Sequence, residues 1–213
     1  FTNNGTVTVS NGALLINGTH TGGANFYVVN SGATLGGTGV INLTTGQVVV
    51  NGKLAPGASP GTLDIDNILN FGNNSNLVVE LGGNTPGDGS GLYDQVNMTD
   101  AASSVNLGTG VTLSVSFVGG FTPSPTDAFF ILTRSDAAAF AASFSGLPEG
   151  SPVTVGSTTM FITYQANWTG NQLTSTLTGG NDIALYVPEP ASLSLLTIGM
   201  LAAAARRRRL QNH

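Results

Sequence analysis

The first half of the chain alternates short runs of β-branched and apolar residues with segments rich in Gly and Asn. Runs of this kind, bounded by turn residues, predict β-strands. Four of them lie at residues 6–9, 26–29, 48–50 and 77–81. The 30 glycines, together with many Asn, Thr and Ser residues, also favour turns and short strands over helices. The pattern therefore predicts an all-β body.

The glycines in the turns recur at a fixed spacing. Four of them lie 20 residues apart, and a leucine follows each of the first three: the glycines are Gly12, Gly32, Gly52 and Gly72, and the leucines are Leu14, Leu35 and Leu54. A period of about 20 residues is what one coil of a β-solenoid needs, because each coil is covered by its neighbours. The spacing favours a solenoid over the alternative, an ordinary β-sandwich.

The second half has a different pattern. Residues 111–121 alternate between apolar and polar and predict a half-buried strand. Further strands are expected at residues 128–133, 153–155, 160–164 and 183–187. Residues 135–144 predict a short helix capped by Ser135 or Asp136. We expect a compact β cap, because an uncapped solenoid end leaves strand edges unpaired.

The C-terminal tail combines an apolar run with a cluster of cations. Residues 191–205 are mostly apolar, and Arg206, Arg207, Arg208 and Arg209 follow them. As a helix, the run would reach about 22 Å at 1.5 Å per residue. A bilayer core is about 30 Å thick, so the helix suits a temporary stop better than a lasting anchor. The positive-inside rule keeps the arginines in the cytoplasm and places the body outside.

Charge and composition narrow the possible functions. Only 8% of the residues are charged, and the net charge is −5. Without the four terminal arginines, Lys53 and Arg134 are the only cations against eleven acidic residues, which gives the body a charge of −9. Such a body does not neutralise phosphates, so nucleic-acid binding is not expected. Because the chain begins with Phe1 rather than Met, we expect a fragment or a mature form.

Candidate catalytic residues are few. The absence of cysteine excludes disulfides, thiolate metal sites and cysteine nucleophiles. His20 is expected in a Thr/Gly turn as a solvated loop residue, since a general base needs a nucleophile and an orienting acid beside it. Asp64 and Asp66 flank Ile65 and so share one face of a strand. Paired carboxylates act in glycoside hydrolysis or bind calcium. The scarcity of cations favours a solvated strand face instead.

Two glycine turns carry oxygen atoms that bind calcium in other settings. They lie at residues 86–94 and 179–182. Neither turn repeats in the way that a tandem calcium motif does. We therefore predict no metal site, no cofactor and no catalytic residue.

Four motifs resemble the autotransporter-associated β-strand repeats of bacterial surface proteins. They are LGGTGVI (35–41), GKLAPGASPGTLDI (52–65), LVVELGG (77–83) and YDQVNMT (93–99). The resemblance covers roughly residues 30–100 and implies a right-handed parallel β-helix. The later strings GLPEGS, FITY and GNDIAL resemble the segment that often follows those repeats.

The tail resembles the PEP-CTERM sorting signal of Gram-negative bacteria. Its motif is Val187, Pro188, Glu189 and Pro190, followed by the apolar run and the four arginines. The resemblance implies that an exosortase processes the chain near the motif. It also implies that the protein is held at the inner membrane through residues 191–205, with a cytoplasmic C-terminus. The body then reaches the cell surface or an extracellular polymer.

Together these patterns predict three units: solenoid repeats at residues 1–104, a small antiparallel β cap at 105–186, and a sorting signal with a single hydrophobic helix at 187–213. The expected function is that of a non-enzymatic surface or matrix protein, adhesin-like or structural, with extracellular polysaccharide as its partner. One alternative is a carbohydrate-active β-helix enzyme that uses Asp64 and Asp66. Another is a glycan- or ice-binding module with regular rows of Thr.

Overall fold

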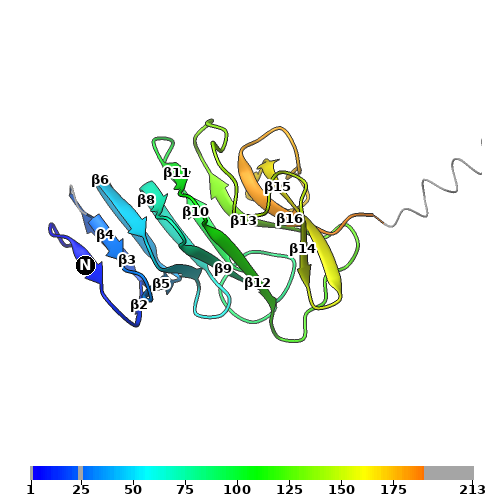
Figure 1. Ribbon diagram of the computed structural model, residues 1–213, viewed down its shortest axis with the longest axis horizontal. Coiled ribbons are helices and arrows are strands. Elements are labelled where there is room, and N and C mark those ends of the chain that lie inside the picture. Colours follow the sequence, from blue (N-terminus) through cyan, green and yellow to red (C-terminus); the bar gives the residue numbers. More distant parts are fainter. Residues whose placement is uncertain (1, 24–25, 190–213) are drawn as a thin grey trace, which may run out of the picture.

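The computed structural model describes residues 2–23 and 26–189. Within these residues every regular element is a β-strand, and the strands form two sheets (Figure 1). The larger sheet contains β1 (Val7–Val9), β3 (Thr19–Gly22), β4 (Phe26–Val29), β6 (Val40–Val50), β8 (Thr62–Phe71), β10 (Gln95–Met98), β11 (Ser104–Leu107), β13 (Ala128–Arg134), β14 (Pro152–Val155), β15 (Thr158–Ala166) and β16 (Asp182–Tyr186). The smaller sheet contains β2 (Ala13–Leu15), β5 (Thr34–Gly37), β7 (Lys53–Pro56), β9 (Asn76–Leu81) and β12 (Thr112–Phe117).

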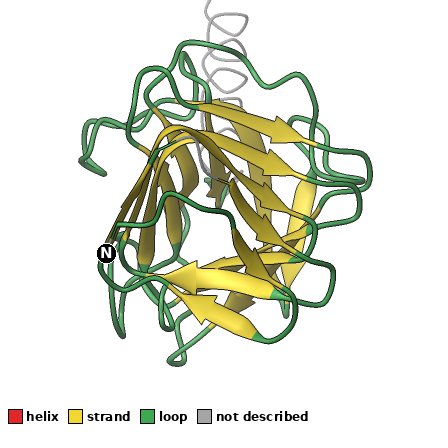
Figure 2. Ribbon diagram, turned by 90° about the vertical axis from the view of Figure 1, so that its left-hand side faces the viewer, coloured by secondary structure: helices red, strands yellow, loops and turns green. Residues whose placement is uncertain are grey.

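The chain passes back and forth between the two sheets. From β4 to β10 each strand belongs to the sheet opposite its predecessor. Neighbouring strands of the smaller sheet, and of the larger sheet as far as β13, are parallel. Parallel strands need a crossover between them, and the opposite sheet supplies it here. The two sheets face each other across a shared interior (Figure 2).

Leucines line the inner face of the smaller sheet. Five of them occupy matching positions on its successive strands, which bring together Leu14, Leu35, Leu54, Leu77 and Leu113. The three in the middle are fully buried, and burying one leucine side chain stabilises a fold by about 1.5–3 kcal/mol. The structure thus stacks the three leucines that the spacing in the sequence singled out.

The facing wall, on the larger sheet, is also apolar. Val9, Val29, Val50, Phe71 and Leu107 lie in register on β1, β4, β6, β8 and β11. The turn glycines serve this stacking in two ways. Gly12 and Gly32 have φ values of 71° and 84°, which favour glycine. At Gly52 the carbonyl oxygen of Ala33 occupies the place of a side chain.

The pairing changes at the far end of the larger sheet. β13 is parallel to β10, but β13–β16, β16–β15 and β15–β14 are antiparallel. All strands expected in the second half are present, including the hairpin of β14 and β15. The division at residue 104 stays a prediction, because parallel pairing continues through β11 and β12.

The predicted helix at residues 135–144 is wrong. The segment is irregular and begins directly after β13. The side-chain amide of Asn181 donates hydrogen bonds to the backbone carbonyls of Asp136 and Ala138, both at 2.9 Å. A helix needs such carbonyls as acceptors for its own N–H groups. Tertiary contacts therefore override the local preference of an alanine-rich segment.

The expected C-terminal helix, residues 191–205, lies outside the described residues. Within residues 2–23 and 26–189, no helix is long and apolar enough to span a bilayer.

Candidate functional site

The Asp64–Asp66 pair lies on β8, on the outer face of the larger sheet. Both side chains are half-buried, while Ile65 between them points into the core. Asp64 accepts a hydrogen bond from Asn97 at 3.2 Å, and Asp66 accepts one from Asn42 at 2.6 Å. Burial is the main cause that raises the pKa of each carboxyl group. The predicted arrangement on one strand face is confirmed.

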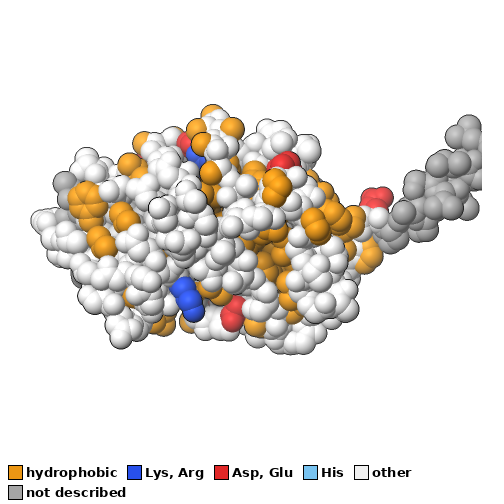
Figure 3. Space-filling model, in the orientation of Figure 1, with side chains coloured by type: hydrophobic (Ala, Val, Ile, Leu, Met, Phe, Trp, Pro, Cys, Tyr) orange, Lys and Arg blue, Asp and Glu red, His pale blue; other side chains and the backbone are white. Residues whose placement is uncertain are grey.

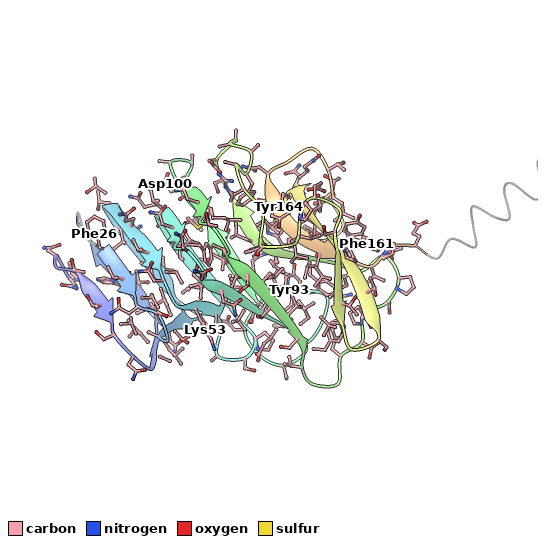
Figure 4. The ribbon with its side chains drawn as sticks, viewed as in Figure 1. Phe26, Lys53, Tyr93, Asp100, Phe161 and Tyr164 are labelled. Carbon is pink, nitrogen blue, oxygen red and sulfur yellow. The ribbon has the colours of Figure 1, made fainter. Side chains whose placement is uncertain are left out.

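Neither described cation pairs with these carboxylates. Lys53 lies on β7 in the smaller sheet (Figure 4), and Arg134 is paired with Asp136 at 2.5 Å. The charges of Asp88 and Asp100 add to the acidic surroundings and raise the two pKa values further. The amide partners of Asp64 and Asp66 favour a fixed polar row along the sheet. The arrangement shows two carboxyl groups anchored by neighbouring asparagines.

His20 does not lie in a solvated turn, so that expectation is wrong. It is part of β3, and its side chain is fully buried. Its Nδ1 atom forms a hydrogen bond with the hydroxyl group of Tyr27, and the two rings meet edge to face with centroids 5.1 Å apart. Burial lowers the pKa of His20 and raises that of Tyr27 to about 12. The pair is a buried polar contact within the stack of strands.

The two glycine turns considered for calcium use their carboxylates in backbone contacts. Asp88 accepts the N–H of Thr62 at 2.9 Å. Asp182 accepts the N–H groups of Arg134 and Trp168 at 2.7 and 2.6 Å. In the part of the chain that the structure describes, no group of three or more His, Asp or Glu residues is placed to hold a metal ion.

The YDQ motif joins three parts of the body. Tyr93 is fully buried, and its hydroxyl group accepts the N–H of Phe130 at 3.1 Å (Figure 4). The side-chain amide of Gln95 donates a hydrogen bond to the backbone carbonyl of Phe130 at 2.7 Å. Asp94 accepts the N–H groups of Gly61 and Glu80 at 2.6 and 2.8 Å. The motif thus ties the start of β8 to β9 and β13.

Asp94 is a buried acid that the sequence did not mark as special. Its side chain is 2% exposed. Burial raises its pKa to about 7, although the two backbone hydrogen bonds act in the opposite direction. The only sequence signal was its place in a motif already quoted, between two residues that also proved to be buried.

The body ends immediately before the expected sorting motif. β16 closes at Tyr186, and the next residue pairs its backbone with the loop before β13. The N–H of Val187 donates to Asp127 at 2.9 Å, and its carbonyl accepts from Thr126 at 3.0 Å. Pro188 and Glu189 are exposed. Of the described part of the motif, Val187 is therefore held against the body, and Pro188 and Glu189 are accessible.

A model of the PEP-CTERM protein-sorting motif matches residues 187–209. The chain carries a PEP-CTERM sorting motif. The motif implies an exported protein that an exosortase, a membrane protease, sorts to the cell surface after membrane anchoring in transit. No curated protein and no solved structure matches the chain.

Of the residues assigned to the PEP-CTERM motif, Val187, Pro188 and Glu189 are described by the structure. Pro190 and the cluster Arg206–209 lie outside the described residues. The motif match spans all of them.

Proposed function

We propose that this protein is a non-enzymatic component of a bacterial cell surface or extracellular matrix, released from the inner membrane by processing at its PEP-CTERM motif. The observation that carries the proposal is the matched motif beginning at Val187, directly after the last strand of a folded body. A sorting signal in this place is separable from the fold. The body is the part that remains to act outside the cell.

We further infer that the body is a right-handed β-solenoid built from autotransporter-associated repeats. The in-register leucine ladder and the alternation of strands between two parallel sheets support this architecture. The motifs that carry the resemblance also contact one another, since Asp94 of YDQ binds the backbone of Gly61 in the SPGT corner.

The topology of the tail is part of the same proposal. We propose that residues 191–205 hold the protein at the inner membrane in transit, with Arg206, Arg207, Arg208 and Arg209 on the cytoplasmic side. Apolar length and charge support this orientation, because cations near the end of a membrane segment stay on the cytoplasmic side. The body then folds outside the membrane and meets the exosortase there.

Polar rows on the outer face of the larger sheet suit a hydroxyl-rich polymer. Asn70 bonds to Gln47 and receives a hydrogen bond from Asn106 at 2.7 Å, which forms one amide row across β6, β8 and β11. Asn42 and Asp66 contribute to a second row. Most of the surface in Figure 3 is neither charged nor hydrophobic. Such a surface favours extracellular polysaccharide as the partner over a charged macromolecule.

The polar rows also argue for a structural role over an enzymatic one. Asp64 and Asp66 are each bonded to a neighbouring asparagine within these rows. We therefore propose that the carboxylates belong to the surface and have no catalytic role.

Ice binding is less well supported. Rows of threonine on a flat sheet are the feature that favours it. In the registers of the described strands and bridges, threonine meets threonine only at Thr2–Thr21 and Thr154–Thr159. Threonines on the parallel strands instead lie beside other residue types, as in the outer row Thr8, Val28, Val49, Asn70 and Asn106.

The sorting step is tested by expressing the full chain in a host with and without its exosortase. We expect a smaller mass and surface or matrix location only when the protease is present. Pro188→Ala should block processing. Pro148→Ala, in the similar Pro-Glu sequence of the body, is the matched control and should be processed normally.

The same experiment tests the partner, by co-sedimentation of the processed body with the host's extracellular polysaccharide. An unchanged mass and location in both hosts would contradict the sorting step. A processed body that stays in the medium and never sediments with polymer would contradict the matrix role alone.

A further inference from the structure

Four apolar side chains surround the point where the folded body ends. Phe161 on β15, Trp168 in the loop after it and Tyr186 at the end of β16 are partly exposed. Leu173, in the same loop as Trp168, is 92% exposed. Figure 3 shows apolar side chains on the surface at this end of the body. We call these four residues the tail-side rim, because the PEP-CTERM motif follows directly after Tyr186.

Strand pairing places the three aromatic members of the rim on one face. Phe161 and Tyr186 are partners on the antiparallel strands β15 and β16, and their ring centroids are 6.0 Å apart. Figure 4 shows Phe161 close to the end of the described chain. Trp168 and Tyr186 both pack against one small apolar cluster, which consists of Ala128, Phe130, Ala166 and Ala184. The three rings therefore belong to a single surface of the antiparallel end.

Hydrogen bonds hold the loop of Leu173 beside the start of the tail. The side-chain amide of Gln172 donates to the backbone carbonyl of Ala128 at 2.6 Å. The N–H of Val187, the first residue of the motif, donates to the carbonyl of Asp127 at 2.9 Å. The loop and the motif are therefore bound to two adjacent residues. Leu173 is exposed at the end of the body from which the tail leaves.

The exposure of Leu173 is fixed by the structure of its loop. The side-chain oxygen of Asn171 accepts the N–H of Leu173 at 2.9 Å. The backbone carbonyl of Asn171 accepts the N–H groups of Thr174 and Ser175 at 3.2 and 3.1 Å. A pair of backbone hydrogen bonds closes the loop at its base. The loop thus holds an apolar side chain away from the body, where only a partner from outside can remove it from water.

The chemistry of the rim fits the surface of a bilayer. Residues 150–181 contain no Asp, Glu, Lys or Arg, so this part of an acidic body approaches lipid without removing an ionised group from water. Two acids flank the exit of the tail: exposed Glu189, and Asp127, whose carboxylate accepts the N–H of Ser124 at 2.7 Å. Trp and Tyr are enriched at membrane–water interfaces, because their rings are apolar and their N–H or O–H groups stay hydrated.

We propose that the tail-side rim lies against the outer surface of the inner membrane while the PEP-CTERM tail holds the protein there. The inference rests on the proposed function, because the tail supplies the anchor. The rim alone buries too little apolar surface to bind a bilayer stably. Attached to the anchor, it meets the lipid at a high effective concentration. The contact keeps Pro188 and Glu189 near the membrane, and it ends when processing removes the anchor.

Trp168 reports directly on this contact, because it is the only tryptophan of the chain. The full chain is reconstituted with vesicles of phosphatidylethanolamine and phosphatidylglycerol, with or without bromine on the acyl chains, and flotation measures the bound fraction. Bromine quenches the fluorescence of an indole ring that lies close to it. We expect quenching of Trp168 in the brominated vesicles. The processed body, which lacks the anchor, should neither float nor be quenched.

Two leucine variants locate the contact on the body. Leu173→Asp should reduce the quenching by about half or more, because an ionised group is costly to remove from water. Leu15→Asp is the matched control: this leucine is also exposed, at 49%, but lies on β2 at the opposite end of the body (Figure 1). It should leave the quenching unchanged. Both variants should float and keep the melting temperature of the unaltered protein, since neither side chain is buried.

Three results would overturn the inference while the full chain still floats, and the proposed function would then stand without it. The emission of Trp168 is the same with and without bromine, or Leu15→Asp reduces the quenching as much as Leu173→Asp does. In the third, the emission changes with protein concentration in the absence of vesicles, which would assign the rim to a second copy of the chain. A full chain that does not float contradicts the membrane step of the proposed function, and the inference falls with it.

Discussion

The parallel part of the body and its antiparallel end are built on different principles. In the parallel part, leucines and valines stack in register, and polar amides form rows outside. At the antiparallel end, single buried polar groups such as Arg134 and Asp182 hold irregular segments together. The first arrangement gains stability by repetition. The antiparallel end instead depends on individual contacts, each of which occurs only once.

The largest expected effect is the pH dependence of the free energy of unfolding, to which one buried acid in each region contributes: Asp94 and Asp182. The folded-state pKa of Asp94, about 7, is above its ordinary value of 3.8. An unfolded chain loses this proton near pH 4, while the folded protein keeps it until about pH 7. The free energy of unfolding should therefore fall between pH 4 and pH 7, by up to about 4 kcal/mol for this group. The raised pKa of Asp182 acts in the same direction.

Urea unfolding at pH 4, 5.5, 7 and 8 measures this dependence. Asp94→Asn should flatten the slope more than Asp182→Asn does, and Asp100→Asn, at an exposed site, is the control. Stability that rises from pH 4 to pH 7 would contradict the burial of these acids. Equal flattening by the two variants would remove the distinction between the regions.

The second effect tests repetition within the parallel part. Leu54→Ala creates a cavity in the middle of the leucine ladder and should cost about 3 kcal/mol. Leu14 lies in β2, at the edge of the smaller sheet, and its side chain is only partly buried, so that Leu14→Ala is the comparison. Its cost should be about 1 kcal/mol, because less apolar area is involved. Equal losses in urea unfolding would show that the ladder does not act as the core.

The smallest effect separates the amides of the two regions. Asn106→Ala removes one exposed member of an outer row and should cost under about 1 kcal/mol. Asn181→Ala releases two backbone carbonyls of the segment after β13 and should cost about 1–2 kcal/mol. Hydrogen exchange should increase within residues 135–144 for the second variant alone. Increased exchange throughout the body would indicate that these carbonyl contacts are not local.

The sequence predicted the parallel part well because its information is local and repeated. Strand runs and the spacing of Leu14, Leu35 and Leu54 follow from residues close to one another. The burial of His20 was missed, since it depends on the hydroxyl group of Tyr27, seven residues away, and on the strands around both side chains. The irregular segment after β13 was also missed, because Asn181 lies more than 40 residues further along the chain. Contacts between residues so far apart do not produce a periodic pattern in the sequence.

The PEP-CTERM motif could be predicted for a different reason. The Val-Pro-Glu-Pro sequence, an apolar run and a cluster of arginines follow one another in a fixed order, and this order distinguishes the motif from other sequences. Asp94 shows the opposite case. Nothing in the residues beside it distinguishes a carboxylate that will be buried against Gly61 and Glu80 from one that will face water.

The short backbone connection of Val187 to Thr126 and Asp127 has a consequence for the lifetime of the exported product. Proteolytic cleavage at any position C-terminal to Val187 leaves all sixteen described strands intact. A cut close to it leaves a chain end held against the body by two hydrogen bonds. Carboxypeptidases in the surroundings of the cell would find only a residue or two to trim before meeting hydrogen-bonded backbone.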